Sequence, residues 1–444
     1  MIKNIFTKLG YSVDCSMQEL ISKWDDWYKG YVEDVHGYKT YNGRTVVKQQ
    51  RETLRMAKRI CEDWANFLMN EKVSFSCNDK IADDKLHRAF EDNDFYVRAN
   101  QLIEKTFAFG TGAFVEYPDA DGHTVIDYVS AGNIYPLSWV DIHITGCAFG
   151  SIKYIGGEKY YYINIHTPLA NGKYLIQNRL FGEKGEEIQL SSNVMPTYVS
   201  DTKRFQIIRP NITNNIEPDS PLGIAIYANA TDELKGVDLI YDSYINEFRL
   251  GKKRIIVPVS LAQMEKESDG VSKPIFDNND TVFYAIPGVE GEKQDLHEIN
   301  MDIRSDEHKQ ALQYTLGLLA DKCGLGNDRY EYTSDGAKTA TEVISEKSVL
   351  FRNLKKHEIV ILSALISLCE AVLDIEGCEP KTDVTISFDD SIIEDKNAEF
   401  VRRMQLVTQG IITREEFRSW YMNEPIETAA EKISESDIDD VPEV

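Results

Sequence analysis

The side chains with the greatest potential for chemistry are carboxylates near the C-terminal end of the sequence. The densest group comprises Asp389, Asp390, Glu394 and Asp395, whose oxygens could hold a metal ion or form an acid pair. The group lies between a predicted strand and a predicted helix, where acidic residues are more often turn and cap residues. We therefore assign no metal ligand and no catalytic residue, and keep an acidic metal centre as an alternative.

The chain contains no recognised nucleotide-binding motif and no recognised motif of a catalytic nucleophile. There is no G-x-x-x-x-G-K-[ST] run, and Gly110-Thr-Gly112 lacks the third glycine and the following helix of a dinucleotide site. Neither G-x-S-x-G nor H-E-x-x-H occurs. The seven cysteines are scattered without C-x-x-C spacing, which disfavours structural zinc and a disulfide framework. We predict no cofactor and no enzymatic activity.

Basic residues gather in two places that could contact phosphate or an acidic surface. One place is the cluster Lys252-Lys253-Arg254, at the negative end of the dipole of a predicted helix. The other is the polar face of a helix predicted to begin near Val46, although most such faces are only solvated. Its basic residues are Lys48, Arg51, Arg55, Lys58 and Arg59.

The net charge limits which DNA-related functions are plausible. The chain carries 49 basic and 73 acidic residues, a formal charge of −24. A protein that reads DNA sequence usually has a basic footprint, and an acidic chain repels phosphate. A conduit has the opposite requirement, because DNA must pass through it without sticking. The charge therefore argues against a repressor-like role and is compatible with a channel.

The elements that would position these groups predict an α+β protein. The first 80 residues are mostly helical, with a capping box at Ser16–Glu19, and another helix is expected from Phe90 to Phe107. Strands are expected as far as about residue 215, including Tyr160–Ile165. No segment is apolar enough for a signal peptide or a membrane span, which predicts a soluble, intracellular protein without membrane contact.

The second half has an unusual order of elements. A helix at Asp232–Leu250, ending at Gly251, and a helix at Arg304–Cys323 flank two short strands. A Gly-rich segment, 324–336, then precedes a helix predicted from Ala337 to about Glu376, which would span about 60 Å. A strand follows at 383–388, then two helices split at Gly410, with a capping box at Thr413–Glu416, and an acidic tail.

This order of elements resembles that of the portal proteins of tailed phages, most nearly the siphophage branch from Gram-positive hosts. Three segments carry the likeness, and the part from 324 to 358 is the most specific. The segments are Phe109-Gly-Thr-Gly-Ala-Phe-Val-Glu116, Asp238-Leu-Ile-Tyr-Asp-Ser-Tyr-Ile-Asn-Glu247 and Lys338-Thr-Ala-Thr-Glu-Val-Ile-Ser-Glu-Lys347. The resemblance covers essentially the whole chain.

The resemblance implies a portal fold divided into named parts. Residues 1–230 would form the wing, an α+β body, and residues 377–444 a C-terminal wing or crown portion with the acidic tail. The two stem helices would be 231–253 and 304–323, with the small β clip at 254–303 between them. The tunnel loop would be 324–336, followed by the long wing helix at 337–376.

The same resemblance implies the partners and the location. Such proteins form a ring, twelve-fold in the virion, that conducts double-stranded DNA non-specifically at a capsid vertex during packaging, retention and ejection. The ring would assemble in the host cytoplasm. Its partners would be the terminase large subunit, which must supply the ATP-driven motor, a head–tail adaptor protein, and the major capsid and scaffolding proteins.

The tunnel loop is where the resemblance implies contact with DNA. Glycines supply flexibility there. Polar and aromatic side chains could make phosphate or sugar contacts, which position DNA without specifying its sequence. The candidate residues are Asn327, Asp328, Arg329, Tyr330, Tyr332 and Lys338. An ordinary solvent loop between two helices is the alternative interpretation of this segment.

Two other functions stay open on the sequence. One is a minor head or adaptor protein that never contacts DNA and forms no ring with a continuous pore. The other is a metal-dependent nuclease that uses the carboxylates at 389–395. The nuclease would cleave labelled DNA in the presence of magnesium, and the other two would not.

Overall fold

The computed structural model is 47% helical and 24% strand, which confirms the α+β class. It describes residues 2–251 except 14, 42–43, 71–72, 120 and 191–194, and then 302–331, 340–378, 382–388, 396–422 and a few residues as far as 433. In 340–348 and 396–399 it describes the backbone alone. Between 252 and 301 it describes the backbone of five short strands.

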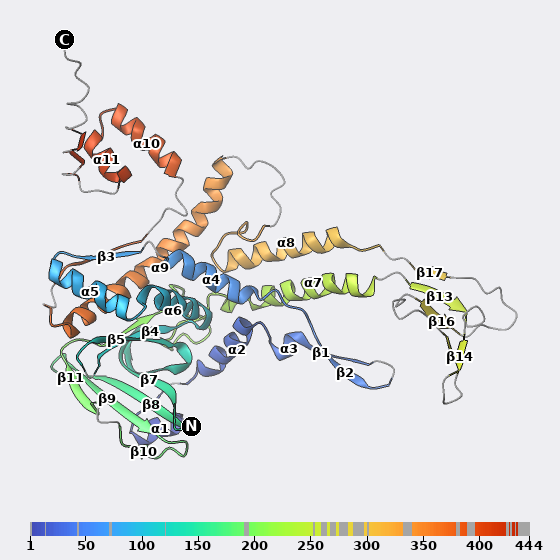
Figure 1. Ribbon diagram of the computed structural model, residues 1–444, viewed down its shortest axis with the longest axis horizontal. Helices are drawn as coiled ribbons and strands as arrows, with labels where there is room; N and C mark the ends of the chain where they lie inside the picture. The colour runs from blue at the N-terminus through green and yellow to red at the C-terminus, as the bar shows by residue number, and fades with distance from the viewer. Residues whose placement is uncertain are drawn as a thin grey trace, which may run out of the picture.

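A body of helices and antiparallel sheets occupies one end of the molecule (Figure 1). Its helices are α1 (Ile2–Lys8), α2 (Gln18–Lys29), α3 (Glu33–His36), α4 (Met56–Leu68), α5 (Lys80–Asp92) and α6 (Phe95–Phe109). Its strands are β1 (Gly37–Tyr41), β2 (Val46–Gln50), β3 (Ser74–Cys77), β4 (Gly112–Pro118), β5 (Thr124–Ser130), β6 (Ile134–Val140), β7 (His143–Ile155), β8 (Glu158–Pro168), β9 (Tyr174–Phe181), β10 (Glu187–Ile188), β11 (Thr197–Ser200) and β12 (Phe205–Ile208).

Three sheets organise the described strands of the body, and a separate hairpin pairs β1 with β2. The largest sheet has the order β10-β9-β8-β7-β6, with β11 also paired to β9. A three-stranded sheet has the order β12-β4-β5, and β3 pairs with β18 (Val384–Ser387) from the far end of the chain. Helix α1 buries Ile5 and Phe6 against the largest sheet. The N- and C-terminal halves are therefore parts of one folded unit.

The main core joins α4, α6 and the long helix α9 (Ala340–Ile375). The ring of Trp64 stacks on Phe107, with centroids 5.7 Å apart, and meets His357 edge-on at 4.7 Å. Burial lowers the pKa of His357 to about 3, so its ring is neutral and its Nδ1 accepts from the amide of Asn211 at 3.0 Å. The 36 residues of α9 span about 54 Å, close to the predicted length.

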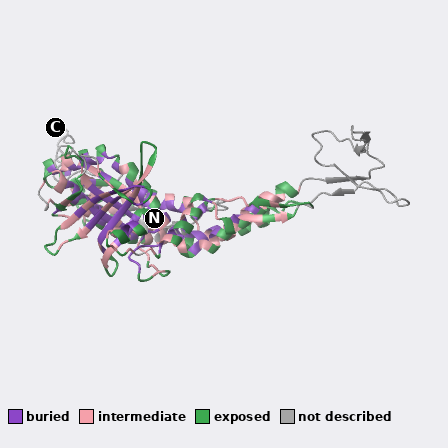
Figure 2. Cartoon of the chain, turned by 90° about the horizontal axis from the view of Figure 1, so that it is seen from below, coloured by how far each residue is buried: buried purple, intermediate pink, exposed green. Residues whose placement is uncertain are grey.

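An arm of two antiparallel helices projects from the body (Figures 1 and 2). Helices α7 (Thr231–Leu250) and α8 (Ser305–Lys322) lie side by side and are joined by an ion pair near each end. Glu233 accepts from Lys322 at 2.6 Å beside the body, and Glu247 pairs with Arg304 at the other end. Gly236 allows close packing, since a Cβ there would lie 3.3 Å from Thr315.

The far end of the arm carries short strands (Figure 1). Strand β13 (Arg254–Pro258) pairs in parallel with β16 (Phe283–Ile286) and antiparallel with β17 (His297–Ile299), while β14 (Met264–Lys266) pairs with β15 (Ser272–Pro274). Both predicted strands of this insertion are present.

Two predictions about helix boundaries were wrong. The helix expected from Val46 begins only at Met56, because the β-branched Val46 and Val47 pair with β1 as a hairpin. The helix expected from Phe90 to Phe107 is broken by Asp94, whose φ is 49°. Helix α2 begins at Gln18, two residues after Ser16, so the capping box predicted at Ser16–Glu19 stays a prediction. Gly251 caps α7 as expected, but with a right-handed φ of −74°.

The C-terminal helices agree with the sequence. Helices α10 (Lys396–Thr408) and α11 (Arg414–Met422) are separated at Gly410, which has a φ of 68°. Thr413 and Glu416 form a reciprocal capping box: the amide of each donates to the side chain of the other, at 2.7 and 3.2 Å. In the part of the chain that the structure describes, no helix is long and apolar enough to cross a membrane.

The segment Phe109–Glu116 is a structural junction. Gly110 has a φ of 82°, and a Cβ at this position would lie 2.3 Å from the carbonyl oxygen of Gly223. The hydroxyl of Thr111 accepts from the amide of Gly223 at 3.0 Å. The two glycines let the start of β4 touch the chain that leads to α7.

Glu116, at the end of this segment, is a buried carboxyl group. It is fully shielded from solvent, and neither of its oxygens accepts a hydrogen bond of good geometry from a described residue. Burial raises its pKa to about 8, and the positive charges of Arg204 and Lys203 only partly oppose that shift. The side chain is therefore mainly protonated at neutral pH.

We predict that Glu116→Gln stabilises the protein at neutral and alkaline pH. The folded pKa of about 8 lies above the ordinary value of 4.5, so the wild type loses stability as pH rises between these values. The amide has no charge to bury, so the melting-temperature advantage of the variant should grow from pH 4.5 to 8 and then level off. Thermal unfolding across this range measures it, and an advantage independent of pH would contradict the assignment.

Candidate functional site

The segment after α8 is held tightly where it leaves the helix. The backbone of Gly324 is left-handed, with a φ of 80°, and its carbonyl accepts from the side-chain amide of Asn353 on α9 at 2.9 Å. The indole nitrogen of Trp64 donates to the carbonyl of Cys323 at 3.1 Å. These contacts fix the start of the segment between α4 and α9, so the glycine here serves a rigid turn.

Asp63 on α4 holds the next part of the segment. The residue is 2% exposed, and its carboxylate accepts from Arg329 through Nη2 at 3.0 Å and Nε at 3.3 Å. The hydroxyl of Tyr330 donates to the same carboxylate at 2.9 Å, and Arg59 approaches within 3.2 Å. The guanidinium of Arg329 also lies over the ring of Phe67, 4.9 Å from its centroid. Two of the predicted DNA-contacting residues are thus bound within their own chain.

Tyr330 is buried by this arrangement. Burial and the neighbouring carboxylate raise the pKa of its hydroxyl far above the usual range, so the group stays a hydrogen-bond donor. Its carbonyl accepts from the side chain of Gln313 on α8 at 3.2 Å. Tyr330 therefore ties the segment to α4 and α8 together.

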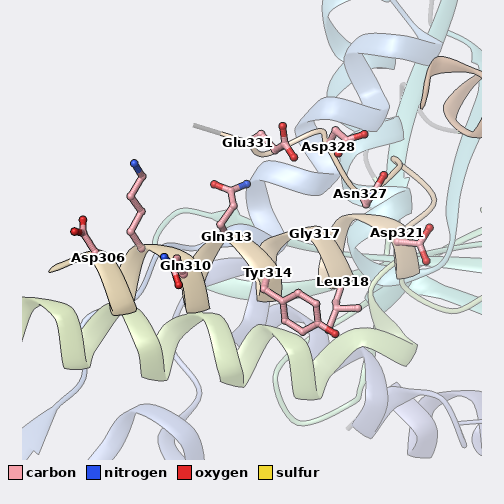
Figure 3. Close-up of a pocket in the computed structure, with 11 residues that line it drawn as sticks. Asp306, Gln310, Gln313, Tyr314, Gly317, Leu318, Asp321, Asn327, Asp328 and Glu331 are labelled. Carbon is pink, nitrogen blue, oxygen red and sulfur yellow. The ribbon is translucent and has the colours of Figure 1, made fainter. Parts of the chain in front are cut away.

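Asn327 and Asp328 lie on the other side of the segment, in an open groove of about 910 Å³ along α8 (Figure 3). Tyr314 and Leu318 contribute its apolar surface. Its charged lining residues are Asp306, Asp321, Asp328, Glu331 and Lys309. With four carboxylates and one ammonium, the groove is acidic and unsuited to holding a phosphate backbone tightly.

The remaining predicted residues are distributed as follows. Tyr332 and Lys338 lie outside the described residues, as do Lys252 and Lys253, while Arg254 begins β13 and is described by its backbone alone. Lys48 is on strand β2 and Arg51 in the following loop, where it donates to the carbonyl of Val35.

The basic residues of α4 have carboxylate partners. Lys58 pairs with Glu104 at 2.5 Å, and Arg59 pairs with Glu62 and Asp63 at 3.6 and 3.2 Å. Arg55 occupies the cap position before α4. The five basic residues therefore do not form one helical face, and their contact with DNA stays a prediction.

Two buried aspartates on α7 attach the arm to the body. The sequence analysis did not predict this role for them. Asp238 accepts from the amide of Leu54 at 2.9 Å and the hydroxyl of Thr53 at 3.0 Å, and Asp242 accepts from the amide of Glu52 at 3.0 Å. Both aspartates belong to the second quoted segment, 238–247. Acids four residues apart beside the apolar positions of a helix were the available signal.

His36 also contributes to this attachment of the arm to the body. Its Nδ1 accepts from the amide of Val32 at 2.8 Å, so Nε2 carries the proton and donates to Asp238 at 2.9 Å. The ring is fully buried. The arm is thus fastened to the body by groups with little freedom to move.

The comparison with protein families decides what kind of protein has this arrangement. The family described as "Phage portal protein, SPP1 Gp6-like" matches residues 18–443, nearly the whole chain. The chain is a member of this phage portal protein family. No curated protein matches it significantly.

Membership of this family bears on the alternative of a nuclease with an acidic metal site. Portal proteins of this family are structural components of a capsid-associated oligomeric ring. Asp389, Asp390, Glu394 and Asp395 lie outside the described residues of this portal protein. Among the described residues, no group of three or more His, Cys, Asp or Glu side chains is placed to hold a metal ion.

Proposed function

We propose that this portal protein forms a closed ring, a dodecamer in the virion, that conducts double-stranded DNA at one vertex of a phage capsid. The observation that carries the proposal is the two-helix arm, with a body at one end and a β-rich insertion at the other. Beside its base, the segment 324–331 leads toward the long helix α9. A ring of such arms would enclose a channel.

The exposed side of the arm supports the ring. Leu239 and Leu250 on α7 are 53% and 62% exposed, and Tyr314 on α8 is 72% exposed. Apolar residues concentrated on a thin two-helix projection mark an interaction surface. Neighbouring subunits would cover them.

The parts of the chain then take the following roles in the proposal. The wing is 1–230, the stem helices are 231–253 and 304–323, and the clip is 254–303. The tunnel loop is 324–336, the long wing helix is 337–376, and 377–444 adds a C-terminal wing or crown portion. The clip would meet the terminase large subunit and later a head–tail adaptor protein, and the wing would meet the major capsid and scaffolding proteins.

Contact with DNA in the proposal is weak and independent of sequence. The amide of Asn327 and the side chains of Tyr332 and Lys338 would touch phosphate or sugar, while the net charge of −24 on the chain prevents tight binding. The bonds of Arg329 and Tyr330 to Asp63 favour a role for these two residues in holding the loop. The protein itself would hydrolyse neither ATP nor DNA.

Electron microscopy of the purified protein, with native mass measurement, tests the proposal. We expect closed rings of about a dozen subunits with a central hole, and only weak retention of linear double-stranded DNA at physiological salt. A stable monomer or dimer at all salt and protein concentrations would contradict the ring. DNA cleavage that depends on magnesium would favour the nuclease alternative instead.

A further inference from the structure

The β1–β2 hairpin carries two lysines that form no ion pair with a described carboxylate. Its register places Lys39 directly opposite Lys48, and Tyr41 directly opposite Val46. Directly paired residues of an antiparallel ladder share one face, so these four side chains lie together. All four are exposed, Tyr41 by 70% and Val46 by 64%.

Physical chemistry makes this hairpin unfavourable in isolation. Like charges directly opposite each other destabilise a strand pair, and a two-stranded hairpin without a packed face is only marginally stable. Neither strand contains an acidic residue. A partner that fits the exposed face must therefore be acidic, with an apolar part to cover Tyr41 and Val46.

The groove along α8 has this chemistry. Asp306 and Asp321 lie near its two ends, and the exposed side chains of Tyr314 and Leu318 lie between them (Figure 3). The charge sign and the apolar area both complement the hairpin. A second copy of the same chain is therefore a suitable occupant.

The positions of the two surfaces prevent them from meeting within one chain. The hairpin lies beside α7, where Glu52, two residues after β2, pairs with Arg249 and donates its amide to Asp242. The groove lies on α8, and the hairpin and α8 are on opposite sides of α7 in the ribbon view (Figure 1). Different patches on opposite sides make a head-to-tail contact, which closes into a ring when the rotation allows.

We infer that the Lys39–Lys48 face of the β1–β2 hairpin of each subunit docks in the acidic α8 groove of the next subunit. The twin lysines meet the groove carboxylates, and Tyr41 and Val46 cover Tyr314 and Leu318. This inference rests on the proposed ring and names the contact that joins its subunits. It also gives Lys48 of β2 a protein partner rather than a DNA partner.

Charge reversal on each side, followed by the combination of both, tests the contact. The pair Lys39→Glu and Lys48→Glu should lower the fraction of protein in rings at least about tenfold at low salt, as should Asp306→Lys with Asp321→Lys. All four substitutions together should restore rings, because opposite charges then face each other again. Native mass measurement reports the ring fraction.

Two controls separate the possible results. Lys105→Glu with Lys184→Glu makes the same change of net charge at exposed sites away from the hairpin, and should leave the rings intact. Circular dichroism shows whether each variant is folded. Failure of the wild type to form rings would overturn the proposed function. Wild-type rings that persist in both reversal variants, or a fourfold variant that stays dissociated while folded, would overturn the hairpin contact alone.

Discussion

Asp63→Ala should free the segment 324–331 from the body and destabilise the protein by about 3 kcal/mol, because it removes the acceptor for a charged and a neutral donor at once. The hydroxyl of Tyr330 would stay buried without this partner, and Arg329 would lose its bidentate contact. The apparent melting temperature should fall by roughly 5 °C or more. Trypsin should also cleave faster after Arg329, because its side chain is no longer bound.

Glu62→Ala is the matched control for this prediction. Glu62 is the preceding residue of α4, is 41% exposed, and pairs with Lys58 and Arg59 at the surface. Surface ion pairs contribute little, so this variant should change the melting temperature by about 1 °C or less and leave cleavage after Arg329 unchanged. Equal effects of the two substitutions would mean that Asp63 does not hold the segment.

In the proposed function, Asp63→Ala should also affect DNA passage. A loop released at Arg329 and Tyr330 would no longer have a defined position in the channel. We expect rings of normal subunit number that package or retain DNA poorly, since the α7–α8 arm is untouched. Loss of the rings themselves would instead place Asp63 in subunit assembly. Packaging in an infection or in vitro system, with ring mass measured in parallel, distinguishes these results.

Gly110→Ala should be the most damaging small substitution in the body. A methyl group at this position would lie 2.3 Å from a backbone oxygen and 2.6 Å from the carbonyl carbon of Gly223, and neither atom can rotate away as a side chain could. The left-handed φ of 82° adds a further cost. We expect a loss of more than about 4 kcal/mol and a mostly insoluble product.

Gly122→Ala isolates the backbone cost from the clash. Gly122 has a similar φ of 88°, but no atom of a described residue lies within 4 Å of the position that a Cβ would take. The cost should be about 1 kcal/mol, and the variant should remain soluble. Soluble yield and denaturant unfolding compare the two variants. Similar behaviour would mean that the contact between Gly110 and Gly223 is not a constraint.

The resemblance segments illustrate how a sequence pattern can reflect structure rather than contact with a ligand. The segment Phe109–Glu116 contributes a backbone contact and a protonated, buried carboxyl group. The segment Asp238–Glu247 contributes two aspartates that mount α7 and a glutamate that pairs with Arg304. The backbone contact of the first segment and the two aspartates of the second segment both help to join the arm to the body.

The sequence by itself determined the α+β class, the two helices of the arm with their β-rich insertion, the long helix and the break at Gly410. Helical periodicity, β-branched runs and glycines are local signals, so these elements could be predicted without knowing their neighbours. The same signals were misleading at Val46. There the pairing of β2 with β1 outweighed a helical pattern that continues into α4.

Only the tertiary structure decided which polar residues are held inside the protein. Asp63 and Arg329 are 266 positions apart, and His36 and Asp238 are 202 apart, so no local pattern could pair them. Arg329 was predicted to contact DNA, whereas it pairs with the buried Asp63, because a buried charge requires a partner. The twin lysines of the hairpin also became visible only in the strand register, because opposition across a ladder depends on which residues pair.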